Sequence, residues 1–108
     1  MTWHVETLNE TVDAELDELP ADMKARFVRT SQLIESVGLL NIGLPHVRHI
    51  EGSIWEIRLK GKAGIARALY VTAKGQRVVV VLVFVKKTEE TPRREIEMAL
   101  QRAKELKQ

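Results

Sequence analysis

The pattern of hydrophobic and polar positions predicts a sheet in the second half of the chain. Its most apolar run covers residues 78–85 and passes without a break into Lys86-Lys87-Thr88. An uninterrupted run of this kind is typical of a central strand that is buried on both faces. Two shorter runs precede it, and the separators between the three runs are hairpin-sized and contain glycine. The pattern therefore predicts a three-stranded antiparallel meander, with strands over residues 53–60, 65–72 and 76–87.

The first half of the chain changes to helical spacing after a short alternating segment. Residues 2–6 alternate and predict a first strand. Apolar residues at helical spacing predict one helix over residues 11–19 and a second that begins near Pro20 and ends at Gly38. We expect these two helices to form an antiparallel helical hairpin.

Two further segments complete the expected fold. Residues 39–52 contain two glycines and a proline without a regular period, which predicts a loop. Residues 92–108 predict a final helix with Thr91 as its N-cap. The elements together indicate an α+β fold over residues 1–108, in a single domain of ordinary size.

Composition narrows the possible functions and location. The net charge is only +2, so any basic surface must come from local clustering. The absence of cysteine excludes disulfides, thiolate zinc sites and cysteine nucleophiles. No apolar run approaches the roughly 18–20 residues that span a bilayer, and no signal peptide is recognisable. His46 and His49 lack a third ligand nearby, so no metal or cofactor is expected. The chain is expected to be cytoplasmic, with no membrane partner.

Placing the hairpin tips at Lys62-Ala63 and Lys74-Gly75 assigns side chains to the faces of the sheet. Arg67 then lies opposite Arg58 on one side and Leu82 on the other. One face is expected to be dry and covered by helices: Trp55, Ile57, Leu59, Ala66, Ala68, Tyr70, Val79, Val81, Val83 and Val85. The other is expected to have an apolar floor with a charged margin: Glu56, Arg58, Lys60, Arg67, Leu69, Val80, Leu82, Phe84 and Lys86.

Arg58 opposite Arg67 is the main candidate for chemistry. Like charges directly across two strands are destabilising. Either Glu56 and other acids bridge the arginines, or both side chains extend into solvent, or the pair binds a phosphate in fork geometry. Lys86 and Lys87 would extend a phosphate site, although for the lysines alone a solvated strand end is the favoured interpretation. Arg93 and Arg94 open the last helix, where the helix dipole disfavours cations, which suggests contact with an anion or with an acidic partner.

Three segments together resemble a known family. They are Ser53-Ile54-Trp55-Glu56-Ile57-Arg58, Ala66-Arg67-Ala68-Leu69-Tyr70, and Phe84-Val85-Lys86-Lys87-Thr88 with Thr91-Pro92-Arg93-Arg94-Glu95-Ile96. In this order they are similar to a phage-derived, HigB-like branch of the RelE/ParE toxin superfamily. The resemblance covers nearly the whole chain.

The resemblance implies the toxin of a type II toxin–antitoxin system that cuts mRNA in the ribosomal A site. It implies a cognate antitoxin, usually a helix-turn-helix protein, as a partner besides the ribosome and mRNA, and no membrane partner. Catalytic residues would be Arg58, Arg67, Lys86 and Lys87, and substrate-binding residues Lys60, Phe84, Thr88 and Arg93. RNA supplies its own nucleophile, the 2′-hydroxyl, so positioning, proton transfer and charge stabilisation are the protein's tasks.

The chain differs from the family pattern at two places. Glu56 stands where some RelE-like nucleases have a basic residue, and no tyrosine or histidine follows Lys87. Two other functions stay open beside an mRNA endoribonuclease. One is a non-enzymatic ParE-type toxin that poisons DNA gyrase, and the other is a plain RNA-binding or partner-binding module.

Overall fold

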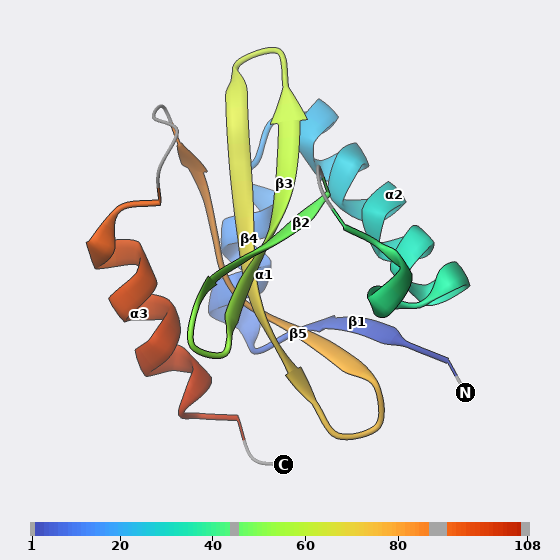
Figure 1. Ribbon diagram of the computed structural model, residues 1–108. Helices are drawn as coiled ribbons and strands as arrows, with labels where there is room; N and C mark the ends of the chain where they lie inside the picture. The colour runs from blue at the N-terminus through green and yellow to red at the C-terminus, as the bar shows by residue number, and fades with distance from the viewer. Residues whose placement is uncertain (1, 44–45, 87–90, 107–108) are drawn as a thin grey trace.

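The protein forms a five-stranded sheet with helices on both faces, seen in a computed structural model that describes residues 2–43, 46–86 and 91–106 (Figure 1). The elements in chain order are β1 (His4–Thr7), α1 (Glu10–Asp17), α2 (Ala21–Val37), the 3-10 helix η1 (Leu39–Asn41), β2 (Val47–Glu51), β3 (Ile54–Gly61), β4 (Gly64–Ala73), β5 (Arg77–Lys86) and α3 (Arg93–Ala103). The predicted α+β class is confirmed, and every helix and strand that the sequence predicts is present.

The strands lie in the order β1-β5-β4-β3-β2. β1 pairs with β5 in parallel, and the other neighbours are antiparallel. The predicted loop over residues 39–52 is wrong in part, because β2 lies within it and extends the meander to four strands. Only Val47 is buried in β2, whereas Arg48 and His49 are exposed. So short an edge strand carries little hydrophobic pattern, which is why the sequence did not indicate it.

Helix boundaries follow the local signals with one exception. The Asn9 side chain caps α1 by accepting from the Val12 N–H at 3.1 Å. α2 begins directly after Pro20 and ends at Gly38, whose φ of 89° favours glycine. The prediction of Thr91 as a cap is wrong: Pro92 is the N-cap of α3, and the Thr91 hydroxyl bonds elsewhere.

The register of the β3–β4 hairpin is the predicted one, with Arg58 opposite Arg67. The register of the β4–β5 hairpin is not. Its turn has three residues, since Ala73 pairs with Arg77, and a bulge between Leu69 and Tyr70 shifts the pairing again. Arg67 therefore lies opposite Phe84 rather than Leu82. The two one-residue shifts cancel beyond the bulge, so Arg67, Phe84 and Lys86 keep the face that the sequence assigned to them.

Between the turn and the bulge, one shift acts alone and reverses the predicted faces of β5. Val80 packs on the side of α1 and α2, and Val79 and Val81 pack on the side of α3. On the first side, buried residues of the sheet meet those of α1 and α2: Val12, Leu19, Met23, Phe27, Ile34, Val47, Ile57, Leu59, Ala66, Ala68, Tyr70, Val78, Val80 and Val83. The second side is smaller and centres on Ala99 of α3. Trp55 and Val85 are not dry as predicted, at 39% and 46% exposed.

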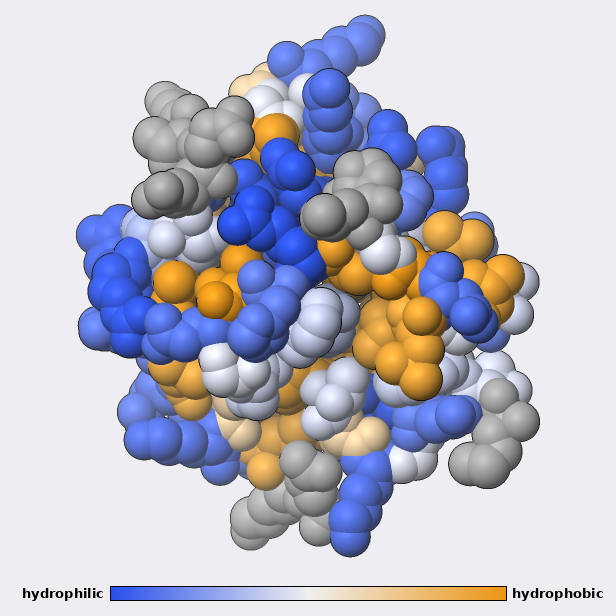
Figure 2. Space-filling view, in the orientation of Figure 1, coloured by the Kyte–Doolittle hydropathy of each residue, from blue (hydrophilic) through white to orange (hydrophobic). Residues whose placement is uncertain are grey.

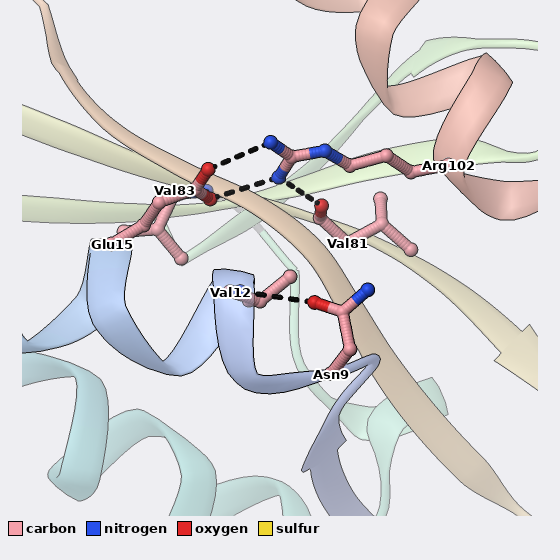
Figure 3. A network of polar contacts seen from close by, with 6 residues as sticks. All are labelled: Asn9, Val12, Glu15, Val81, Val83 and Arg102. Carbon is pink, nitrogen blue, oxygen red and sulfur yellow. Dashed lines mark hydrogen bonds and ion pairs between the residues drawn. The ribbon is translucent and has the colours of Figure 1, made fainter.

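An ion pair joins helices from opposite sides of the sheet (Figure 3). Arg102 of α3 binds Glu15 of α1, with Nη2 2.8 Å from Oε2. Arg102 also donates to the Val81 carbonyl at 2.9 Å, and Glu15 accepts from the Val83 N–H at 3.1 Å. These side chains form hydrogen bonds with backbone groups of β5 beyond the end of β1. An open strand edge there would otherwise favour association with another chain.

Within the described part of the chain, no helix has the length and apolar character needed to cross a membrane.

Candidate anion-binding site

Three strands bring basic side chains to one face of the sheet. In one row across β3, β4 and β5 lie Arg58, Arg67 and Phe84, and in the next row lie Lys60, Ile65 and Lys86. Directly paired residues and alternate residues along a strand share a face. The predicted grouping of Arg58, Lys60, Arg67, Phe84 and Lys86 on one face is thus confirmed. Lys87 and Thr88, the other two predicted site residues of this strand end, lie outside the described residues.

Arg67 is bound to a carboxylate inside the protein. Its Nη1 donates to Glu56 Oε1 at 2.6 Å, and the two side chains are 1% and 0% exposed. Glu56 Oε2 also accepts from the Thr91 hydroxyl at 3.1 Å, and Arg48 Nε lies 3.6 Å from Oε1. Of the alternatives considered for the arginines, bridging by Glu56 therefore describes Arg67. A buried carboxylate requires such partners, because an unpaired charge in the interior is very costly.

Arg58 is placed differently, although it is directly opposite Arg67. Its side chain is half-buried, and its guanidinium forms no hydrogen bond or ion pair with any residue in the described ranges. Its backbone N–H donates to the His46 carbonyl at 3.0 Å, which holds the end of β2 against β3. Lys60 is exposed one row further on. Arg58 and Lys60 are the cations of this face that are most available to an anion.

Lys86 and Phe84 lie at the end of β5. Lys86 is only 6% exposed, so its stem is packed into the protein, and Phe84 is half-buried beside it. Figure 2 shows a strongly hydrophilic area above the middle of the molecule, over the part of β3 and β4 that is uppermost in Figure 1. This face combines charged side chains with the apolar side chain of Phe84, whereas the sequence predicted an apolar floor with a charged margin.

Arg93 lies at the start of α3 and is matched by the protein's own acids. It binds Glu51 of β2 and Glu97 one turn further along α3, while remaining 58% exposed. The hydrogen bond from Arg93 lowers the pKa of Glu51. Its neighbour Arg94 lies 3.6 Å from Glu95. The dipole penalty on these cations is thus offset within the molecule.

Sequence reasoning missed Arg48 as a member of this site, because it lies on the strand that the pattern did not indicate. It is 45% exposed and reaches Glu56 from β2. The predicted structural role of Tyr70 agrees with its burial: its side chain is 1% exposed, on the opposite face, and burial raises its pKa to about 12. Among the residues that the structure describes, no group of histidine and acidic side chains is arranged to hold a metal ion.

Fold and site together define a small α+β protein with a basic, partly neutralised sheet face. Residues 14–104 match the family described as phage derived protein Gp49-like (DUF891), and the chain belongs to that family. A chain in the crystal structure of the archaeal RelE-RelB complex from Pyrococcus horikoshii OT3 has the same fold, with a TM-score of 0.60 and 19% identity. The superposition covers 82% of this chain and all of that one. No curated protein sequence matches. The predicted RelE-like fold is confirmed, and the family match agrees with the phage-derived branch that the sequence resembles.

Proposed function

We propose that this chain is the toxin of a type II toxin–antitoxin system, and that it cuts mRNA on the ribosome. Membership of the Gp49-like family and the fold shared with RelE support the class of toxin. The observation that carries the choice of RNA is the pair Arg58 and Lys60. They are neighbouring cations on one face of β3, and neither forms an ion pair within the described ranges.

This arrangement suits phosphodiester cleavage by the RNA's own 2′-hydroxyl. In that reaction the protein holds the phosphate in line with the hydroxyl and stabilises the charge that develops on it. Arg58 binds the phosphate in fork geometry, and Lys60 binds a neighbouring phosphate. Lys86 or Lys87 moves the proton, and Phe84 and Thr88 border the nucleotide.

Arg67 has a supporting place in this proposal. Its charge is held in the interior by Glu56, 2.6 Å away, so it acts from beneath the phosphate that Arg58 binds. Glu56 replaces a basic residue of some RelE-like nucleases. Because Glu56 neutralises Arg67, Arg58 is the cation of the Arg58–Arg67 pair that binds the phosphate directly. Arg93 approaches the same substrate from α3 when its pairs with Glu51 and Glu97 open.

The partner that controls such a toxin is a cognate antitoxin. The structure similar to this chain contains RelE together with RelB, which supports an antitoxin for this chain too. We propose a helix-turn-helix antitoxin encoded beside it, acting in the cytoplasm. A short open reading frame of that kind next to this one supports the assignment.

The test is to induce the chain without its antitoxin and to map mRNA 5′ ends and DNA breaks in the same cells. We expect cuts within codons of translated messages, lost in Arg58→Gln and kept in Lys74→Gln. Lys74 is an exposed cation between β4 and β5, and its substitution by glutamine removes the same charge as Arg58→Gln. Gyrase trapped on DNA without mRNA cuts would contradict the proposal and identify a ParE-type toxin. Normal growth on induction would leave only a binding module.

A further inference from the structure

A second basic surface lies beside the candidate site, between α2 and the β3–β4 hairpin. This α2–hairpin groove has a volume of about 570 Å³ and is lined by Asp22, Arg26, Arg29, Lys60, Gly61 and Lys62. Lys60 is among the residues that line the groove and also follows Arg58 on β3 by two positions, so the two surfaces meet at the end of this strand.

The first turn of α2 lies close against Gly61 of the hairpin. A Cβ atom on Gly61 would lie 2.7 Å from Asp22 Oδ2 and 2.8 Å from Met23 Cγ, so a larger residue there would displace these side chains. Asp22 also accepts from the Lys62 N–H at 2.7 Å. The first turn of α2 is thereby held at the hairpin, and Arg26 and Arg29 follow on the next turn of the helix.

The charges in the groove are only partly balanced by its own lining. Arg26, Arg29, Lys60 and Lys62 form no ion pair with any residue of the described ranges. The acid of the lining, Asp22, accepts from the Lys62 N–H and keeps its negative charge, so these four cations exceed the acid and the groove stays positive. Arg26 and Arg29 are three residues apart on one helix face, where like charges are destabilising. A cluster of cations that is present in spite of this repulsion is suited to an anionic ligand.

The other residues that line the groove indicate which kind of anion it binds. Ala25 and Gly61 are its uncharged members, and both are small. A protein partner is usually held by large apolar or aromatic anchors in a pocket, and this lining offers none. Nucleic-acid backbones need no apolar anchor, because lysine and arginine can hold a series of phosphates.

We propose that the α2–hairpin groove is a second binding site for RNA, which takes backbone phosphates of the strand or of ribosomal RNA next to the segment bound at Arg58. The proposal rests on the proposed function in that RNA is the ligand. The groove binds and orients; it contributes no group to the cleavage itself. Lys60 contacts the phosphates between the two surfaces.

The test measures binding of a fluorescent 16-nucleotide oligouridylate over a series of salt concentrations. The variant is Arg26→Gln/Arg29→Gln, and the matched control is Lys74→Gln/Lys104→Gln. All four side chains are accessible and both variants lose the same charge, but Lys74 and Lys104 lie outside the groove. Single-stranded binding loses a slope of about 0.7 in log K against log salt for each phosphate contact removed.

We expect the groove variant to bind more weakly, with a slope smaller by about 1.4, and the control to keep the slope of the unmodified chain. Lys62→Gln, a second variant, should lose about 0.7. Equal losses in variant and control would show an effect of net charge alone and overturn the proposal. It is overturned as well if the unmodified chain does not bind the RNA, or if oligoglutamate of the same length competes as well as RNA.

The outcome is separable from that of the proposed function, because the assay needs neither ribosomes nor cleavage. If the induced chain cuts no mRNA while the groove variants lose slope, the nuclease proposal fails and the RNA groove stands. If the chain cuts mRNA but the groove variants bind like the control, the groove proposal fails alone.

Discussion

The two faces of the sheet reach the same burial by different physical means. Glu56 and Ile57 are adjacent on β3, point to opposite faces, and are both 0% exposed. Ile57 lies among apolar side chains from α1, α2 and the sheet. Glu56 is held by Arg67, Thr91 and Arg48. Burial by itself therefore does not separate a structural position from a functional one, whereas the kind of partner does.

The two kinds of burial also differ in the free energy that they contribute to folding. Apolar burial is favourable in proportion to the area removed from water. A buried ion pair often contributes no more than hydrophobic side chains of similar volume, although loss of one partner is strongly destabilising. Both faces contribute apolar burial to folding, while the Glu56–Arg67 pair keeps charge inside the second face without adding comparable stability.

Separating Glu56 from Arg67 is expected to have the largest effect. Glu56→Leu should lower the free energy of unfolding by about 3–5 kcal/mol, because Arg67 loses its buried carboxylate. The double variant Glu56→Leu/Arg67→Met should regain most of that loss, since both charges are gone and the volume is kept. Urea unfolding at pH 7 of the single and double variants measures the coupling.

The matched control for this cycle is Ile57→Val on the apolar face. It should cost about 0.5–1.5 kcal/mol, the usual range for one buried methylene group. A Glu56→Leu variant no less stable than Ile57→Val would show that the two faces are energetically alike, contrary to the comparison.

The ionisation of Tyr70 at alkaline pH provides a test of burial on the dry face. Burial raises its pKa to about 12 from an ordinary value of 10, so the folded state favours the neutral phenol. The resulting stability is fully present below pH 10 and is lost as the pH rises toward 12. By pH 12 the loss relative to Tyr70→Phe should be about 2 kcal/mol. Because the chain has 1 tyrosine, absorbance at 295 nm follows its ionisation directly. An absorbance midpoint near pH 10 with the fold intact would contradict the burial of its hydroxyl.

The Glu15–Arg102 pair tests the connection between the two faces. Glu15→Gln keeps an oxygen for the Val83 N–H but removes the charge opposite Arg102. We expect a loss of about 1–2 kcal/mol, the range for hydrogen bonds to charged groups. Faster amide hydrogen exchange at Val83 would accompany it. Glu18→Gln, at an exposed position just after α1, should change stability by less than about 0.5 kcal/mol. Equal effects of the two changes would mean that the pair does not connect the layers.

The smallest expected effect concerns Glu6 and Arg77, where β1 joins β5. Hydrogen bonds from Arg77 lower the pKa of Glu6. Stability from a lowered carboxyl pKa is present above its unfolded value and is lost as the pH falls through the folded value. Glu6→Gln should therefore cost under about 1 kcal/mol at pH 7, as for other exposed pairs, and nothing at pH 2. Thermal melts at both pH values check this, and a cost that persists at pH 2 would exclude the ion pair as its source.

Much of the fold was predictable because its signals are local. Gly61 and Gly64 end a hairpin whose register the sequence predicted correctly, and Pro20 and Gly38 border α2 as expected. The site was predictable to the extent that it follows from alternation along strands. Arg58 and Arg67 fall on one face by register alone.

The parts that failed depend on contacts distant in sequence. The three-residue turn before Arg77 moved three valines of β5 to faces opposite to those predicted, and the bulge between Leu69 and Tyr70 ends this stretch, although a run of valines carries no signal for either feature. β2 forms because β3 offers a free edge, not because its own residues favour a strand.

Periodicity and turn residues were enough to predict every element except β2 and the 3-10 helix η1, the order of the strands from β3 to β5, and the gathering of cations on one face. Tertiary packing, by contrast, sets which arginine Glu56 neutralises, because Arg48, Thr91 and Arg67 meet it from segments far apart in the chain. It also decided that α2 borders the hairpin closely enough to form a second basic groove, since that distance depends on packing across the sheet.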